Sequence, residues 1–325
     1  MPAPAPTPTA ANRPPSGGPA LIDPAALMRI KSLQLRARVI VEGFEKGLHR
    51  SPYHGFSAEF SEYRQYTPGD DPRYLDWRLF ARSDRYYIKK FEDETNLRCH
   101  LIADGSRSMG YGSGPVTKWD YARTAAATVA YFLSRQRDAV GLVTFADRVV
   151  EYIPPRARPG QLAHLTAALH RDPGGTATDL VGPLGEAGAV TRRRGLFVLF
   201  SDLLVPASAV RTAIGGLRAA GHDVIVFRVL DPQEVHFRFD APGLFRDAET
   251  GREVFVDPRT AADEYRARFA AHAAEVRQEC TSAGADFEQI TTDRPLELVL
   301  FDLLRARARR GRAPVRSAQN RGGGR

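Results

Sequence analysis

The most informative stretch of the chain reads Leu97-Arg98-Cys99-His100-Leu101-Ile102-Ala103-Asp104-Gly105-Ser106-Arg107-Ser108-Met109. Its first half predicts a buried strand, which the turn-forming pair Asp104-Gly105 ends. Asp104, Ser106 and Ser108 then follow at alternate positions, so a short extended loop can turn their oxygens toward one point. A carboxylate and two hydroxyls suit a hard divalent cation such as Mg²⁺ or Mn²⁺. We therefore predict a metal site at the C-terminal edge of an open parallel sheet.

Downstream of this loop, strand and helix patterns alternate. Near-continuous apolar strands that alternate with amphipathic helices predict an α/β fold with a doubly wound, mostly parallel sheet. An antiparallel excursion over 235–256, where Val235, Phe237 and Phe239 alternate with polar residues, interrupts the pattern. The predicted strands cover 97–103, 139–145, 149–153, 195–201, 223–230 and 286–291, and the predicted helices cover 117–137, 159–169, 180–191, 206–220, 258–282 and 295–307.

Composition divides the chain into four parts. Residues 1–20 are rich in Pro and predict a disordered N-terminus. Residues 21–96 predict a helix over 24–42, followed by a small β-containing subdomain with many aromatic residues. We expect a strand over 85–92 to form a hairpin with 97–103. Residues 97–304 form the predicted α/β domain, and residues 305–325 a disordered Arg-rich tail.

Charge and cysteine content limit the classes of function. The formal net charge is +8, and eight arginines without a single acid lie between 303 and 325, so the rest of the chain is formally neutral. No apolar run is long enough for a transmembrane helix, and no secretory signal is present. The two cysteines, Cys99 and Cys280, form neither a disulfide framework nor a metal motif. These features predict a soluble cytoplasmic protein without a membrane span.

Two further loops complete the predicted metal site. Ligands of open α/β sheets bind outside the carboxyl ends of the strands. The run Gly174-Gly175-Thr176-Ala177-Thr178-Asp179-Leu180 precedes a helix, and Ser201-Asp202 follows the strand over 195–201. We expect a threonine hydroxyl and the Asp202 carboxylate to join Asp104, Ser106 and Ser108. Thr176 and Thr178 are the two threonines of this run that could supply the hydroxyl.

This combination resembles the metal-ion-dependent adhesion site of von Willebrand factor A domains, which have a Rossmann-like fold. The matching elements are Asp-x-Ser-x-Ser, a Thr before a helix and Ser-Asp after a strand. The resemblance implies that Asp104, Ser106, Ser108, Thr178 and Asp202 surround Mg²⁺ or Mn²⁺. It also implies that a carboxylate of a protein partner completes the coordination.

The N-terminal part narrows the resemblance. It is similar to the signature of the bacterial family called "domain of unknown function 58", whose members pair this signature with a von Willebrand A-like half. Many members lie beside genes for MoxR-type AAA+ ATPases, which implies such an ATPase as a partner. The matching residues are Gly47, His49, Ser51, Gly55, Glu59, Phe60, Tyr63, Arg64, Tyr66, Pro68, Gly69, Asp70, Asp71, Arg73, Asp76, Trp77, Ala81 and Arg82.

We therefore expect a non-catalytic, metal-dependent protein-interaction module, an adaptor in complex assembly or maturation. The sequence has no phosphate-binding loop and no dinucleotide fingerprint, and it identifies no catalytic residue. Two alternatives remain open. The same cation could serve a Mg²⁺- or Mn²⁺-dependent hydrolase as a Lewis acid. The arginine tail could bind an anionic partner, although no motif for specific nucleic-acid recognition is present.

Overall fold

The computed structural model describes residues 21–48, 63–65, 87–89, 97–171, 175, 178–191 and 193–311. Its centre is a six-stranded sheet with the order β10-β7-β6-β3-β4-β5. All neighbouring strands are parallel except the edge strand β5, which is antiparallel to β4. This confirms the predicted mostly parallel α/β sheet. The strands are β3 (Arg98–Asp104), β4 (Ala139–Phe145), β5 (Val149–Arg156), β6 (Leu196–Ser201), β7 (Asp223–Leu230) and β10 (Asp286–Thr291).

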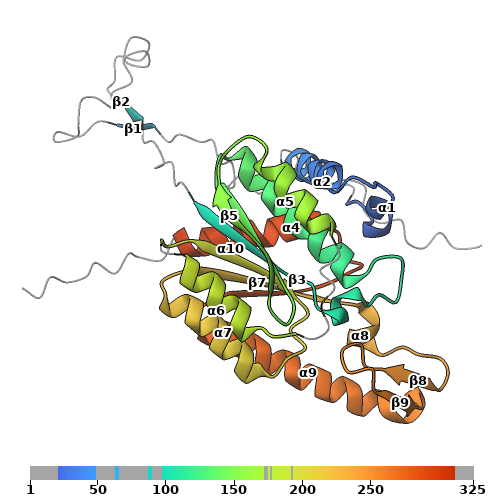
Figure 1. Ribbon diagram of the computed structural model, residues 1–325. Coiled ribbons are helices and arrows are strands. Elements are labelled where there is room, and N and C mark those ends of the chain that lie inside the picture. The colour runs from blue at the N-terminus through green and yellow to red at the C-terminus, as the bar shows by residue number, and fades with distance from the viewer. Residues whose placement is uncertain are drawn as a thin grey trace, which may run out of the picture.

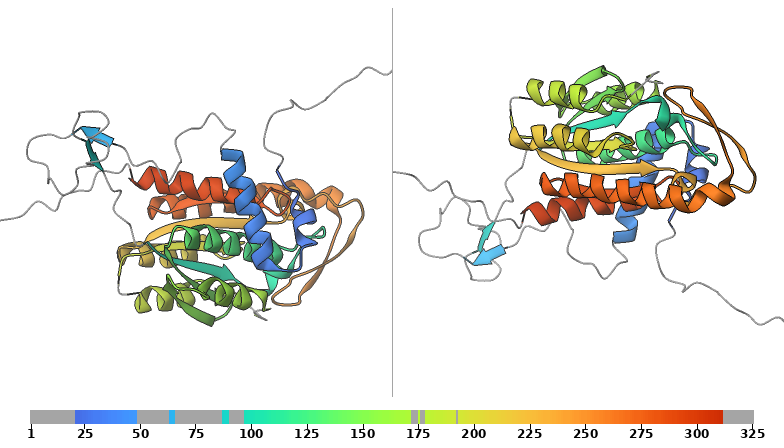
Figure 2. Two further views of the ribbon diagram at one scale, coloured as in Figure 1. Left: turned by 90° about the horizontal axis from the view of Figure 1, so that it is seen from above. Right: turned by 90° about the horizontal axis from the view of Figure 1, so that it is seen from below.

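Helices cover both faces of the sheet (Figure 1), as a doubly wound fold requires. The views from above and from below each look onto one set of helices, with strands of the sheet visible behind them (Figure 2). On one face lie α4 (Lys118–Arg135), α5 (Gln161–His170) and α10 (Glu297–Gly311), with α1 (Pro24–Met28) and α2 (Leu33–Leu48) packed outside α4. On the other face lie α6 (Val181–Val190), α7 (Ala207–Ala219) and α9 (Pro258–Ser282).

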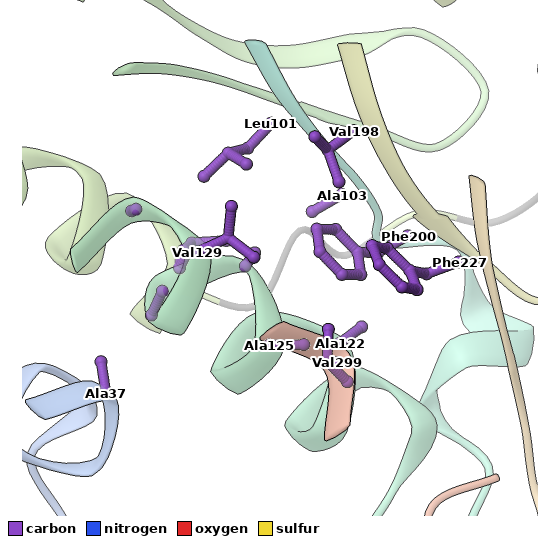
Figure 3. Close-up of a cluster of buried hydrophobic side chains, with 14 of the residues drawn as sticks. Ala37, Leu101, Ala103, Ala122, Ala125, Val129, Val198, Phe200, Phe227 and Val299 are labelled. Carbon is purple, nitrogen blue, oxygen red and sulfur yellow. The ribbon is translucent and has the colours of Figure 1, made fainter. Parts of the chain in front are cut away.

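The two cores follow from strand alternation. Successive side chains of a strand point to opposite faces, so Leu101 and Ala103 enter the core beneath α4, whereas Ile102 enters the core beneath α6 and α7. In the first core Phe200 and Phe227 stack with ring centroids 5.2 Å apart (Figure 3). Because both faces of the central strands are buried, these strands read as continuous apolar runs.

The strand order reverses between β3 and β6. From β3 the chain crosses to β4 on one side, and after β5 it returns to β6 on the other side of β3. Loops that leave the carboxyl ends of β3 and β6 therefore diverge, which opens a crevice at this topological switch point. Asp104 is the last residue of β3 and Ser201 the last of β6.

Three local predictions were wrong. The strand expected over 85–92 is β2 (Tyr87–Lys89), and it pairs with β1 (Tyr63–Gln65) rather than with β3. β3 cannot accept it because β4 and β6 already occupy both of its edges. The helix expected over 24–42 is broken into α1 and α2. The Arg36 guanidinium donates hydrogen bonds to the backbone carbonyls of Met28 and Ile30, so these carbonyls at the break have partners.

The third wrong prediction concerns the antiparallel excursion over residues 235–256. The strand expected from Val235 onward does not form, because Val235 and His236 end the short helix α8 (Pro232–His236) and Phe237 follows it in a left-handed conformation. The capping box of Asp231 and Glu234 begins this helix. The antiparallel part of the excursion lies later, in β8 (Gly243–Arg246) and β9 (Glu253–Val256). A short 3₁₀ helix, η2 (Arg107–Gly110), follows β3.

Several predicted regions fall partly or wholly outside the described residues. They are the Pro-rich segment 1–20, most of the signature over 47–82, and the arginine tail from 312 onward. The helix α10 extends to Gly311, beyond the expected start of the tail at 305. Among the described helices, none combines the length and apolar character needed to cross a membrane.

Candidate metal centre

Two adjacent strands end in residues that contact each other. The Ser201 hydroxyl, at the end of β6, donates a hydrogen bond of 2.5 Å to Oδ2 of Asp104, at the end of β3. Both side chains are buried. Since a hydroxyl bound to a carboxylate fixes its orientation, the Asp104 carboxylate is held at the switch point by its neighbouring strand.

The loop after β3 turns back onto the same carboxylate. The backbone N–H of Ser106 donates to Oδ1 of Asp104 at 2.9 Å. The hydroxyls of Ser106 and Ser108 lie 3.1 Å apart, although Ser108 lies in the 3₁₀ helix η2 and not in the extended loop that we predicted. The structure therefore brings these three sequence-predicted residues together in one loop.

Asp104 occupies an unusual electrostatic environment. Its side chain is fully buried, and burial, together with the nearby Asp202 carboxylate, raises the pKa of Asp104 to about 7. The hydrogen bonds from Ser201 and Ser106 act in the opposite direction but do not offset this. Its described partners are hydroxyl and amide groups and no cationic side chain, so a bound cation would relieve the repulsion between the two carboxylates.

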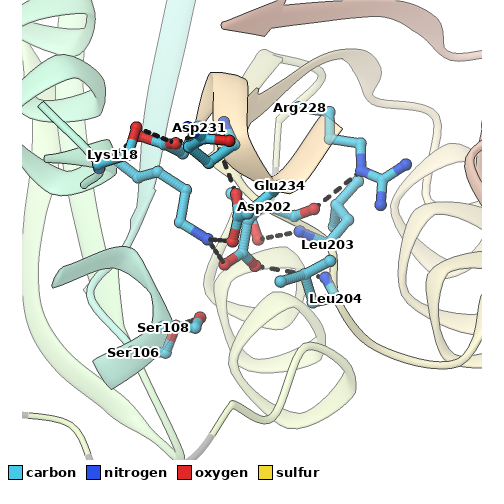
Figure 4. Close-up of polar contacts among 12 residues, drawn as sticks. Ser106, Ser108, Lys118, Asp202, Leu203, Leu204, Arg228, Asp231 and Glu234 are labelled. Atoms are coloured by element: carbon cyan, nitrogen blue, oxygen red, sulfur yellow. Dashed lines mark hydrogen bonds and ion pairs between the residues drawn. The ribbon is translucent and has the colours of Figure 1, made fainter. Parts of the chain in front are cut away.

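Asp202 is near enough to Asp104 to raise the pKa of Asp104, and it forms an ion pair with a lysine of the same chain (Figure 4). The Lys118 ammonium, on the first residue of α4, lies 2.8 Å from Oδ2 of Asp202 and 2.5 Å from Oε1 of Glu234. Burial alone lowers the pKa of Lys118, but the two carboxylates and their hydrogen bonds more than offset it, so the pKa is raised. Burial also raises the pKa of Glu234, against the pull of Lys118.

Further contacts fix the backbone around Asp202. The Arg228 side chain on β7 donates to the Asp202 carbonyl at 2.9 Å. Leu203 takes a left-handed conformation with φ of 49°, which turns the chain sharply after β6. The N–H of Leu204 then reaches Oδ1 of Asp202 at 3.3 Å. The Asp202 carboxylate is thus held by Lys118 and by the N–H of Leu204, and Arg228 holds the backbone carbonyl of the same residue.

Thr178 has a different partner from the one predicted. Its hydroxyl donates to Oε1 of Glu249 at 2.5 Å, and Glu249 lies in the turn between β8 and β9. The same loop nevertheless abuts the Asp104 loop, because a Cβ added to Gly175 would lie 3.1 Å from the Gly105 carbonyl oxygen. Thr176, the alternative, lies outside the described residues.

These donors fit a small oxygen-loving cation. The set comprises the Asp104 and Asp202 carboxylates with the hydroxyls of Ser106, Ser108 and Thr178, and such ligands suit Mg²⁺ or Mn²⁺. In the described part of the chain, no three His, Cys, Asp or Glu side chains converge as a metal-binding group. A hydroxyl-rich site therefore suits these residues better than a histidine or thiolate site.

Four residues of this region escaped sequence-based prediction as site residues. Ser201 stood beside the predicted Asp202 but was not assigned a role. Lys118 is the first residue of a helix, and the apolar periodicity of that helix does not indicate that a lysine at this position is buried. Glu234 and Glu249 lie in the irregular excursion, 32 and 47 residues beyond Asp202 in the printed numbering, so only folding brings them to this edge of the sheet.

The sequence also matches a known family. Residues 62–279 match the family model described as "Protein of unknown function DUF58". The chain belongs to the DUF58 family. This confirms the resemblance noted in the N-terminal signature. The chain is 31% identical over 304 residues to the uncharacterized protein Rv1480 of Mycobacterium tuberculosis, covering 91% of this chain and 93% of that protein. It is 35% identical over 135 residues to the uncharacterized protein MAV169 of Mycobacterium avium, covering 41% and 78%.

Solved structures are similar to this DUF58 chain at low identity. BatB from Bacteroides thetaiotaomicron has 14% identity and a TM-score of 0.45, covering 66% of this chain and 99% of that chain. An aerotolerance-related membrane protein from Bacteroides fragilis has 14% identity and a TM-score of 0.44, covering 64% and 99%. The SpRpn10 VWA domain has 10% identity and a TM-score of 0.35, covering 63% and 93%. The fold described above rests on its own strand order and not on these partial similarities.

Proposed function

We propose that this DUF58 protein is a metal-dependent protein-interaction module. In this proposal Asp104, Ser106, Ser108, Thr178 and Asp202 surround Mg²⁺ or Mn²⁺, and a carboxylate of the partner protein fills a remaining coordination position. The supporting observation is the buried Asp104 carboxylate at the switch point, held by Ser201 and Ser106 and facing the charge of Asp202.

The arrangement suits binding at an exposed edge of the sheet. Asp104 and Asp202 lie deep, and Ser108 and Thr178 are partly exposed, so a cation held by these groups has protein on one side and the surroundings on the other. Mg²⁺ usually keeps several water ligands, and an acidic side chain can replace one of them. The site therefore offers an incoming carboxylate a place on the metal without any further covalent chemistry.

A partner of the MoxR-type AAA+ ATPase class fits the family resemblance of the sequence. In this proposal the DUF58 protein acts as an adaptor between such an ATPase and its client complex. The chemistry of recognition would be an aspartate or glutamate of the partner, presented to the cation, with the metal supplying most of the charge complementarity.

The test is affinity capture with the full-length chain in buffer containing Mg²⁺ or EDTA, followed by mass spectrometry of the retained proteins. Asp104→Ala and Asp202→Ala are compared with the wild type, each after circular dichroism has shown it to be folded. We expect a set of proteins that is retained with Mg²⁺ and lost with EDTA and in both variants. Retention of the same proteins under all these conditions would overturn the proposal.

A further inference from the structure

The excursion between α8 and α9 is anchored to the body of the protein. Phe237 is 7% exposed and stacks on Tyr265 of α9 with ring centroids 4.2 Å apart. Phe245 of β8 packs against Phe237 and Phe239 at 5.6 and 4.9 Å. Figure 2 shows the excursion running across one end of the layered body. Aromatic packing of this kind fixes the base of the hairpin.

The turn of this hairpin is closed by its own polar groups. Oδ1 of Asp247 accepts the N–H groups of Glu249 and Thr250 at 2.9 and 2.6 Å. The Asp247 carbonyl accepts the N–H of Gly251, whose φ of 71° lies in the left-handed region. The hairpin therefore presents Glu249 at its tip in a defined conformation.

Glu249 contacts the loop that carries a candidate ligand. Its Oε1 accepts the Thr178 hydroxyl at 2.5 Å, although the two residues are 71 positions apart in the chain. A carboxylate offers about four lone-pair sites, and Thr178 uses one of them. A cation bound by the Thr178 hydroxyl would thus lie within reach of this carboxylate without a movement of the hairpin's base.

We infer that Glu249 is a further ligand of the cation, contributed by the chain itself at the position that a partner's carboxylate would take. This inference rests on the proposed function, since it assumes a cation at the Asp104 site. The hairpin then acts as an internal competitor. An acidic partner gains the metal only when Glu249 leaves it, so binding of the partner and release of the hairpin tip are coupled.

Mn²⁺ alone is a sufficient probe, because its paramagnetism enhances the relaxation of protons in exchanging water ligands. The experiment compares the wild-type full chain with Glu249→Ala and with Glu253→Ala, which removes an exposed carboxylate from the same hairpin. We expect Glu249→Ala to bind Mn²⁺ about tenfold more weakly. We also expect a larger relaxation enhancement for each bound Mn²⁺, because water replaces the lost carboxylate. Glu253→Ala should match the wild type.

Hydrogen exchange provides a second measurement that does not depend on affinity. Saturating Mg²⁺ should slow amide exchange over residues 247–252 in the wild type and in Glu253→Ala, but not in Glu249→Ala. Equal Mn²⁺ affinity and equal relaxation enhancement in the wild type and Glu249→Ala would overturn this inference and leave the proposed function intact. Absence of Mn²⁺ binding by the wild type would overturn both.

Discussion

The Lys118 ammonium lies 2.8 Å from Oδ2 of Asp202, and the two side chains are 0% and 2% exposed. The chain thus places its own cation against one of the two carboxylates at the switch point. Glu234 forms a second ion pair with the same ammonium group. Asp104 has no such partner among the described residues, so the two neighbouring carboxylates of the candidate site differ in how their charge is balanced.

Removing this cation should be costly. Lys118→Met leaves Asp202 and Glu234 without their counter-charge in a buried setting, and we expect a loss of about 3–5 kcal/mol in the free energy of unfolding. The matched control is Lys31→Met, at an exposed position, which should change it by less than about 0.5 kcal/mol. Urea denaturation at neutral pH measures both. Similar values for the two variants would show that Lys118 does not balance buried charge.

A buried histidine predicts a decline of stability in acid. His100 is 1% exposed, and its ring stacks on Phe197 with centroids 4.6 Å apart. Burial, with His222 and Arg98 nearby, lowers the pKa of His100 from 6.5 to about 4. Because the unfolded chain is protonated first, the contribution of His100 to stability is complete above pH 6.5 and is lost as the pH drops toward 4. The shift corresponds to about 3 kcal/mol.

The variant His100→Phe tests this assignment. It preserves the stacking on Phe197 but removes the titrating group, so its free energy of unfolding should lack the decline that protonation of His100 contributes between about pH 6.5 and 4. Burial also lowers the pKa of the neighbouring His222, so the variant retains the part of the pH dependence that His222 contributes. Urea denaturation across this range provides the measurement. Parallel curves for the variant and the wild type would assign the acid sensitivity to other groups.

The hairpin should detach without unfolding the body of the protein. Phe245→Ala removes the ring that packs on Phe237 and Phe239, and local opening of such a unit costs less than global unfolding. We expect faster amide exchange over residues 243–256 with little change in the central sheet. Leu244→Ala, its 68% exposed neighbour on β8, is the control and should exchange like the wild type. Accelerated exchange throughout the sheet would mean that the hairpin is part of the main cooperative unit.

The sequence predicted the parts of the fold that depend on local pattern. The apolar run of β3 and its end at Asp104 were predicted correctly because a buried strand and a turn pair leave a signal in adjacent residues. The joint position of Asp104 and Ser201 followed from a general rule about strand ends. The hydroxyls of Ser106 and Ser108 do come within 3.1 Å of each other, but through a 3₁₀ helix and not through the predicted extended loop.

Other features could not be predicted because they depend on contacts between distant segments. β2 comes shortly before β3 in the sequence, which favoured a hairpin between them. However, β4 and β6 occupy both edges of β3 and exclude that pairing. Lys118 is charged, and only the carboxylates of Asp202 and Glu234 make its burial favourable. The contact between Thr178 and Glu249 depends on how Phe245 of the hairpin packs on Phe237, which in turn stacks on Tyr265 of α9, and no periodicity in the sequence encodes this packing.

We propose that oxygen donors at the carboxyl ends of β3 and β6 bind one divalent cation. Isothermal titration with Mn²⁺ tests it most directly, using the full-length wild type, Asp104→Ala and the surface control Ser208→Ala on α7. We predict saturable binding of a single Mn²⁺ by the wild type and the control. We also predict binding at least about tenfold weaker in folded Asp104→Ala. No saturable binding by the wild type, or equal affinity in folded Asp104→Ala, would contradict it.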